Sequence, residues 1–378
     1  MNKKIPFFDY PRLFLDNEKK LTEIFKDVSS RGSFILQKDL KNFEDNLAAY
    51  TGAKHAVGVG NATDALQIAL KVAGIKSNDE VIISTHTMIA TAGAINHVGA
   101  LAIPVDIRDD HLIDYSQIEK NITAQTKAIM PTQLNGRTCN MDIICDIADK
   151  HNLLLFEDAA QGLGSKFKNK SAGTFGLASA ISFYPAKNLG SLGDGGAILV
   201  NDETLYKEII SFRDHGRDPV SGKVMTWGVN SRLDNLQAAF LNYFLSKYDT
   251  VINRRRYLAN LYYENLKNVE ELYLPPSLED SNDHFDVFQN YEIRAKNRDS
   301  LRKYLLDHNI GTLIQWAGMA IHHHQNLGFN QTLTRADEFF RHILMLPMNM
   351  FVTDEDVIHI SQLIKKFYNQ SKKCNEPK

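Results

Sequence analysis

The sequence is poor in cysteine, and its three cysteines, Cys139, Cys145 and Cys374, include no CxxC pair. Their odd number and their spacing fit a reducing compartment better than a disulfide framework. The chain also lacks any run approaching the roughly 18 apolar residues that a membrane helix needs. The chain also has almost no excess of one charge, because its 43 basic and 45 acidic residues give a net charge of -2. These absences predict a cytoplasmic protein without a membrane span and without bulk attraction to nucleic acid.

A glycine-rich dinucleotide fingerprint is missing as well. No GxGxxG motif follows the first predicted strand, HAVGVG, which starts at His55. This absence argues against a nicotinamide-dependent Rossmann enzyme. What remains is an ordinary globular composition, with 43% hydrophobic and 23% charged residues, in a chain long enough for roughly two to three domains.

From about residue 20 to 245, short β-branched runs alternate with helical patterns. This alternation is typical of an α/β domain around a mostly parallel sheet. The predicted strands are HAVGVG from His55, EVIIST from Glu80, LAIPVDI from Leu101, AIMPTQL from Ala128, LLLFED from Leu153, ASAISFY from Ala178 and GGAILVN from Gly195. A helix is expected to start after Asn61, because asparagine is a good N-cap and apolar residues then recur at helical spacing.

A long helix is predicted from Leu233 to Arg256, and beyond it the pattern changes to shorter mixed elements. We therefore predict a large cofactor-binding domain over residues 1–245 and a smaller α+β domain over residues 246–378.

Three segments carry residues suited to chemistry. The strand LLLFED ends at Asp158, where the carboxyl ends of parallel strands usually meet ligands. The stretch SFYPAKNLGSLGDGGAI places Ser182 and Lys187 after another strand and ahead of glycines that let backbone approach a ligand. Residues 60–63, GNAT, lie at a strand-to-helix junction, which offers backbone N–H groups and a positive helix end to a phosphate.

Together these segments match the needs of pyridoxal 5'-phosphate (PLP). PLP requires an amine for the imine, a carboxylate on its pyridine nitrogen, and a phosphate cradle. Lys187 can supply the amine and then act as the general base, and Asp158 can keep the pyridinium protonated. Each residue also has a plainer interpretation, as a surface lysine or a helix-capping aspartate. The amine must be neutral to attack, so its pKa must fall below the ~10.4 of free lysine.

The motifs GNATDAL, EDAAQGLG, SFYPAKNLGSLGDGGA and GVNSRLDNLQAA, in this order, resemble those of the DegT-type sugar-nucleotide aminotransferases, which are fold-type I PLP enzymes. The resemblance runs through nearly the whole chain. It implies a large PLP domain, with a mostly parallel mixed sheet between helices, and a small C-terminal α+β domain. The cofactor-binding positions that it implies are Asn61, Ala62, Thr63, Met88, Asp158, Gln161, Ser182, Lys187 and Asn230.

The resemblance also implies roles for these residues. Lys187 would be the Schiff-base lysine, Asp158 would pair with the pyridine nitrogen, and Gln161 would lie near the ring hydroxyl. Met88 stands at the ring-stacking position, which is often aromatic in the family, and its thioether can still contact a ring. Asn230 would reach the phosphate of the neighbouring subunit's cofactor, so a homodimer is expected.

The reaction that the resemblance implies is amino transfer, from glutamate, to a nucleotide-linked keto-sugar. Such reactions make deoxyaminosugars for glycans such as lipopolysaccharide. The SFYPAKNLGSLGDGGA stretch is more similar to enzymes acting at C-3 of a dTDP- or UDP-linked 3-keto sugar than to C-4 enzymes. Lys187 argues against the family's dehydratases, which carry histidine at this position. A C-4 enzyme, a cyclitol-ketone aminotransferase and a PLP-binding regulator without turnover stay open.

The candidate substrate-binding residues each have a structural alternative. Gln133 and Asn135 stand where the family often has histidine and tyrosine. Arg232 suits a diphosphate, but a structural ion pair is about as plausible. Trp316 can stack on a base or pack in a core, and residues 322–324, all histidine, can face substrate, solvent or the core, with metal binding the least favoured. The candidates are Tyr184, Gln133, Arg232, Trp316 and His322; no metal site is predicted.

Overall fold

The computed structural model describes residues 3–279 and 282–375. Its centre is a seven-stranded sheet in the order β1-β9-β8-β5-β4-β2-β3. The strands in that order are β1 (His55–Val59), β9 (Gly196–Val200), β8 (Ala178–Ser182), β5 (Leu154–Asp158), β4 (Thr126–Met130), β2 (Glu80–Ser84) and β3 (Leu101–Val105). Strand β9 is antiparallel to both of its neighbours, and the other pairs are parallel. The predicted α/β class and the predicted strands are confirmed.

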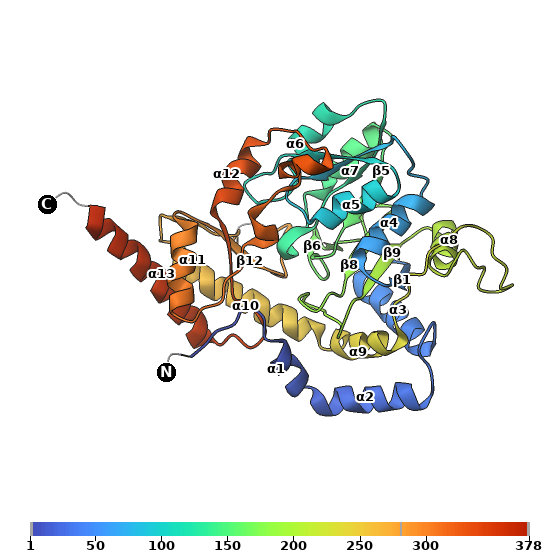
Figure 1. Cartoon of the computed structure of the whole chain (residues 1–378), viewed down its shortest axis with the longest axis horizontal. Helices are drawn as coiled ribbons and strands as arrows, with labels where there is room; N and C mark the ends of the chain where they lie inside the picture. The colour runs from blue at the N-terminus through green and yellow to red at the C-terminus, as the bar shows by residue number, and fades with distance from the viewer. Residues whose placement is uncertain (1–2, 280–281, 376–378) are drawn as a thin grey trace.

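Helices cover both faces of this sheet (Figure 1). They are α3 (Lys38–Thr51), α4 (Ala62–Val72), α5 (Ile89–His97), α7 (Met141–Lys150), α8 (Glu203–Arg213) and α9 (Asn235–Leu245). Successive side chains of a strand point to opposite faces, so Ile198 of β9 packs in the core with α4 while Leu199 packs in the core with α3. Strands buried on both faces read as continuous apolar runs, and this is why the sequence predicts them well.

Helix α4 begins where the sequence predicts. The side-chain oxygen of Asn61 accepts a hydrogen bond from the backbone N–H of Asp64 at 2.8 Å, which is the geometry of an N-cap. Helix α7 starts in the same way, since Asn140 Oδ1 accepts from the Ile143 N–H at 3.4 Å.

The single long helix predicted over residues 233–256 is wrong, because two helices lie there. Helix α9 is followed by α10 (Tyr248–Leu266), and between them Lys247 has a φ of -115° and a ψ of 6°, which are not helical. The Ser246 hydroxyl donates to the Tyr243 carbonyl oxygen at 2.7 Å. Such local bonds from serine compete with the helical backbone pattern and tend to bend helices.

A second core lies to one side of the sheet (Figure 1). It is built from α10, α11 (Arg298–Asp307), α13 (Asp354–Asn375), β10 (Leu272–Tyr273), β12 (Tyr291–Ala295) and β13 (Ile343–Leu346). The three strands form an antiparallel sheet with β12 in the middle. Ile5 packs in this core too, so the N-terminal segment joins it. The division into domains at residues 245 and 246 stays a prediction.

The remaining elements are short or peripheral. They are α1 (Tyr10–Leu15), α2 (Glu18–Ser30), α6 (Tyr115–Ile118), α12 (Thr334–His342), and a small sheet of β11 (His284–Phe285), β6 (Lys166–Phe167) and β7 (Lys170–Ser171). Within residues 3–279 and 282–375, no helix combines the length and the apolar character needed to cross a membrane.

Candidate active site

Asp158 and Lys187 meet at the carboxyl ends of two neighbouring strands. Asp158 is the last residue of β5, and Lys187 lies in the loop that follows β8. Strands β5 and β8 are parallel neighbours, with Asp158 opposite Ala180. Each of the two charged groups shifts the pKa of the other. The sheet therefore brings together the two residues on which the sequence prediction depends.

The Asp158 carboxylate is buried and fixed in orientation. Its Oδ2 accepts from the Thr91 hydroxyl at 2.6 Å, and its Oδ1 accepts from the Ala160 N–H at 3.1 Å. Thr91 is itself held by Thr87 at 2.7 Å, and Thr132 donates to Thr87 at 2.8 Å. Burial raises the pKa of Asp158, while the bonds from Thr91 and Ala160 and the charge of Lys187 oppose that rise. A chain of threonine hydroxyls thus holds this carboxylate in place.

Burial makes the Lys187 amine unusually easy to deprotonate. Desolvation lowers its pKa from 10.5 to about 8, and the nearby Asp158 charge acts in the opposite direction. A substantial fraction of the amine is therefore neutral near physiological pH, as imine formation requires.

One glutamine clamps the loop on both sides of Lys187. Gln289 Nε2 donates to the Ala186 carbonyl oxygen at 2.9 Å, and Gln289 Oε1 accepts from the Asn188 N–H at 2.8 Å. The sequence analysis missed Gln289, because it lies about a hundred positions further along the chain and carries no local motif. Its two bonds fix the backbone from which the reactive amine projects.

The start of α4 packs closely against β9, which pairs with β8. Ser182, at the end of β8, pairs with Gly196 of β9. A Cβ atom added at Gly196 would lie 2.4 Å from the Asn61 carbonyl carbon and 2.7 Å from the Ala62 nitrogen, so only glycine fits there. Ser182 and the backbone at Ala62 and Thr63 are thereby gathered at one helix N-terminus. Such an end binds phosphate groups.

Asn61 and Asn230 have structural surroundings that leave their expected cofactor roles as predictions. The Asn61 side chain is used on the Asp64 N–H as a plain N-cap. Asn230 is exposed, and the adjacent Ser231 anchors the segment, because its hydroxyl donates to Asp64 at 2.6 Å and accepts from the Gly60 N–H at 3.0 Å. Contact of Asn230 with a partner's cofactor stays a prediction.

A cavity of about 320 Å³ opens beside Lys187. Its walls include Phe8 and Tyr10 from the N-terminal segment, Arg255 of α10, and Phe351 ahead of α13. The Phe8 and Tyr10 rings are stacked, with their centroids 5.3 Å apart. The sequence analysis missed this wall, because aromatic residues near an N-terminus give no signal of what they will face. Tyr184 and Met88 are 53% and 51% exposed, so both are open to a ligand.

Gln133 does not point to a substrate, and that prediction is corrected here. The residue is fully buried. Its Nε2 donates to Glu157 at 2.7 Å, and its Oε1 accepts from the Cys139 N–H at 2.7 Å. Because both ends of the amide are used inside the protein, Gln133 supports the buried Glu157 carboxylate instead.

Arg232 and Trp316 also make structural contacts. Arg232 donates to Asp214 at 2.7 Å, which is the ion pair weighed against a diphosphate contact. Trp316 is partly buried between two apolar clusters, and its ring lies edge-on to His86 with a centroid distance of 5.2 Å. Substrate contacts from these two residues stay predictions.

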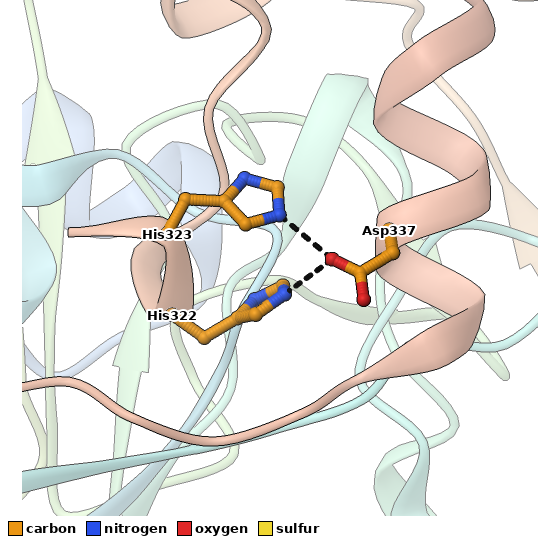
Figure 2. Close-up of side chains that lie close together, drawn as sticks. All are labelled: His322, His323 and Asp337. Atoms are coloured by element: carbon orange, nitrogen blue, oxygen red, sulfur yellow. Dashed lines mark hydrogen bonds and ion pairs between the residues drawn. The ribbon is translucent and has the colours of Figure 1, made fainter. Parts of the chain in front are cut away.

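His322 and His323 both bond to Asp337 of α12 (Figure 2). Their Nε2 atoms lie 2.9 and 2.8 Å from the same Asp337 oxygen. The Ala320 N–H donates to Nδ1 of His323 at 3.1 Å, so a neutral His323 carries its proton on Nε2 and donates it to Asp337. This polarity disfavours a metal ion at that nitrogen, although the three side chains cluster closely enough to hold one.

His322 is held away from the open cavity. It is 4% exposed, and its Nδ1 lies 2.7 Å from the hydroxyl of Thr85, just after β2. It therefore ties the segment before α12 to the end of β2. The substrate contact expected of His322 has no support from this arrangement.

Comparison with known proteins decides the family. Residues 16–365 match the DegT/DnrJ/EryC1/StrS aminotransferase family. The chain belongs to this family. Over 96% of its length this aminotransferase is 36% identical to the "Pleiotropic regulatory protein" of Geobacillus stearothermophilus, of which 98% is covered. It is 34% identical to the dTDP-3-amino-3,4,6-trideoxy-alpha-D-glucose transaminase of Streptomyces venezuelae, with 96% of each chain covered.

The fold is that of solved members of the family. The structure of S. venezuelae DesV in complex with a ketimine intermediate is 34% identical, with a TM-score of 0.92, and the match covers 96% of this chain and 98% of that one. The enzyme is a PLP-dependent aminotransferase. Its own residues fit this cofactor, because they provide a partly buried amine of lowered pKa, an oriented carboxylate and a helix N-terminus against which Gly196 of β9 packs closely.

Proposed function

We propose that this aminotransferase moves an amino group from glutamate to C-3 of a dTDP- or UDP-linked 3-keto deoxysugar. The observation that carries the proposal is the Lys187 amine, which lies opposite the Asp158 carboxylate and beside a cavity of about 320 Å³. The C-3 position is supported by the S. venezuelae relative, whose name specifies a dTDP-3-amino sugar. A cytoplasmic location remains a prediction from the low cysteine content.

The residues that would hold PLP are assigned by their geometry and chemistry. Lys187 would hold it covalently, and Asp158 would keep a proton on the ring nitrogen. Ser182 and the backbone at Ala62 and Thr63 would receive the phosphate. When bound, PLP supplies a protonated ring that withdraws electrons from the substrate carbon that is losing its proton.

The protein's own groups would then perform the proton transfers. Lys187 Nζ, whose pKa burial lowers to about 8, would be suited to accepting and returning a proton near neutral pH. Gln289 holds Ala186 and Asn188 on either side of it, so the amine keeps its position through the cycle. Asp158 cannot turn away from the ring nitrogen, because Thr91 and the Ala160 N–H hold both of its oxygens.

We further propose a homodimer in which Asn230 reaches the partner's cofactor. The support is an exposed apolar surface on the segment after α8, which projects beyond the body of the protein (Figure 1). On it Val220 is 93% exposed, Val224 67%, Met225 70% and Trp227 95%. Apolar side chains gathered in this way usually mark an interface, and Asn230 ends the same segment.

Product analysis tests the proposed substrate. The enzyme is incubated with PLP, glutamate and, separately, dTDP-3-keto, UDP-3-keto and UDP-4-keto sugars, and the products are examined by NMR. We expect a new amino group on C-3 with at least one 3-keto sugar. An amino group found only on C-4 would show that the C-4 alternative is correct.

A PLP-binding regulator is the second candidate, because the relative from G. stearothermophilus is named a regulatory protein. The half-reaction with glutamate separates the two functions. An aminotransferase loses the visible absorbance of the Lys187 imine when glutamate is added. A regulator without turnover keeps that absorbance at every glutamate concentration.

A further inference from the structure

A hydrogen-bonded chain of polar side chains runs from Gln161 into the interior. Gln161 Oε1 accepts from the Asn135 N–H at 2.9 Å and from Asn290 Nδ2 at 3.3 Å. Asn290 Nδ2 also donates to Asn135 Oδ1 at 2.8 Å. Asn135 Nδ2 donates to Glu292 Oε2 at 3.0 Å. The chain therefore links a residue of the proposed cofactor site to a carboxyl group on β12.

This chain fixes the direction of the Gln161 amide. Two donors occupy Oε1, so the Nε2 group must point to the other side of the amide. Asn135, in the left-handed region with a φ of 54°, is followed by Gly136, where a Cβ atom would lie 2.5 Å from the Gln289 nitrogen. The loop is thus packed tightly against the segment that leads into β12. Asn135 and Gln161 are therefore held by one connected set of hydrogen bonds.

Glu292, at the inner end of the chain, lacks the partners that a buried carboxylate needs. It is 1% exposed, and its Oε1 has no hydrogen-bond partner among the described residues. By contrast the buried Glu157 accepts from Gln133 Nε2 and from the N–H groups of Gly173, Phe175 and Gly176. An ionised carboxylate without such donors or a cation is very costly in the interior. Burial accordingly raises the pKa of Glu292 to about 8.

His86 faces Glu292 with a lone pair. Its Nδ1 lies 3.0 Å from the carbonyl oxygen of His111, which can only accept, so Nδ1 carries the proton. Burial lowers the pKa of His86 to about 3, so the ring is neutral and its Nε2 is unprotonated. That Nε2 lies 3.5 Å from Glu292 Oε2 and has no hydrogen-bond partner among the described residues, and Nδ1 of His111 lies 3.8 Å from the same Glu292 oxygen. If Glu292 were ionised, a lone pair of its Oε2 would face the lone pair of His86 Nε2, and the two would repel each other. A proton on the Glu292 carboxyl group removes this repulsion.

The charged groups nearby do not supply an alternative partner. Asp110, Arg137 and Asp286 line a cavity of about 30 Å³ that Glu292 also borders. Arg137 is committed to Asp286 in a 2.5 Å ion pair. Arg294 lies over the Tyr273 ring at 3.7 Å. Within residues 3–279 and 282–375, no lysine or arginine forms an ion pair with Glu292.

We propose that Glu292 is a positioning residue of this aminotransferase: as an uncharged acid sharing its proton with His86, it holds Asn135 and, through Asn135, keeps the Gln161 N–H group directed to the cofactor ring. Asn290 closes the chain by bonding to both Asn135 and Gln161. This inference rests on the proposed place of Gln161 at the ring hydroxyl. It means that Glu292 on β12 supports the site from the interior and that its carboxyl group keeps its proton there.

The proton is tested directly by infrared difference spectroscopy on the holoenzyme below neutral pH. Wild type is compared with Glu292→Gln, because the C=O stretch of a protonated carboxylic acid is well separated from that of a carboxylate. We expect the wild type to show the acid band and the variant to lack it. Asp142→Asn is the control, because Asp142 is an exposed carboxylate paired with Lys168, and it should remove a carboxylate band instead. If Glu292→Gln also removes only a carboxylate band, the shared proton is refuted.

The positioning role is tested by measuring kcat and KM. The rates are divided by the amount of bound PLP, so that misfolded protein does not lower the measured kcat. We expect Glu292→Leu to lower kcat about tenfold with little change in KM for the sugar nucleotide. Glu292→Gln should restore only part of that loss, because its amide oxygen can still accept from Asn135 but then offers no proton to His86, which faces the same atom. An unchanged kcat per bound PLP in Glu292→Leu would overturn the proposal. A wild type that fails to react with glutamate would instead refute the proposed function, and the infrared result would still stand.

Discussion

Replacing Asp158 with asparagine should speed the reaction of Lys187 with PLP and slow the half-reaction with glutamate. In the wild type, burial lowers the pKa of Lys187 to about 8 while the Asp158 charge acts to raise it. Asparagine keeps the size of the side chain but removes the charge, so burial then acts unopposed. The pKa of Lys187 should fall below about 8 in Asp158→Asn, and the amine should react with PLP more readily at neutral pH.

The structure sets the size of this effect. With a pKa of about 8, roughly 10% of the Lys187 amine is neutral at pH ~7, compared with about 0.03% for a lysine at the ordinary value. The variant can therefore gain at most about tenfold in the rate of imine formation at that pH. The glutamate half-reaction should change the other way, by about a hundredfold or more, because the ring nitrogen loses the acid that keeps it protonated.

Rapid mixing of apoenzyme with PLP, followed by visible absorbance between about pH 6 and 9, measures the first rate. The decay of that absorbance with glutamate measures the second. Asp142→Asn is the control, since Asp142 is a surface carboxylate paired with Lys168 and should change neither rate. A half-reaction at the wild-type rate in Asp158→Asn would refute the proposed role of this acid. Slower PLP capture at neutral pH would refute the electrostatic coupling between Asp158 and Lys187.

Two further predictions concern the covalent link and the dimer. Lys187→Ala should keep its helical circular dichroism but form no borohydride-stable pyridoxyl adduct, and an adduct on another residue would show that the lysine is misassigned. Trp227→Ser combined with Met225→Ser removes exposed apolar surface, so sedimentation should show a weaker dimer with unchanged secondary structure. A dimer of wild-type affinity in this double variant would place the interface elsewhere.

The parts of the fold that the sequence predicts well are those with local causes. The strands of the main sheet are apolar along their whole length because both faces are covered, and Asn61 caps α4 through a residue three positions away. The break between α9 and α10 escaped prediction, because the apolar spacing continues across Ser246 and Lys247 while the backbone does not. The spacing of apolar residues shows which side of a helix is buried, but it does not show whether the helix axis is continuous.

The residues of the candidate site likewise include some that the sequence predicts and some that it does not. Lys187 and Asp158 follow strands in recognisable motifs, so their location at one edge of the sheet could be predicted. Gln133 was interpreted wrongly because its true partners, Glu157 and the Cys139 N–H, were invisible in the sequence. Supporting residues such as Gln289 act over about a hundred positions, and no local pattern shows that a glutamine in one segment will bond on both sides of a lysine in another.

The strand β12 shows how one short segment can serve both the second core and the site. Tyr291 and Ile293 are buried in the second core, and since side chains alternate along a strand, Glu292 faces the other way, toward the Asn135 side chain that Asn290, just ahead of the strand, also contacts. There they bond to Asn135, while Gln289, just ahead of the strand, holds the Lys187 loop. The packing of β12 against β10 and β13 therefore sets the position of groups on both sides of the cofactor site. A substitution that shifts this strand should slow the reaction even when it touches no residue of the cavity.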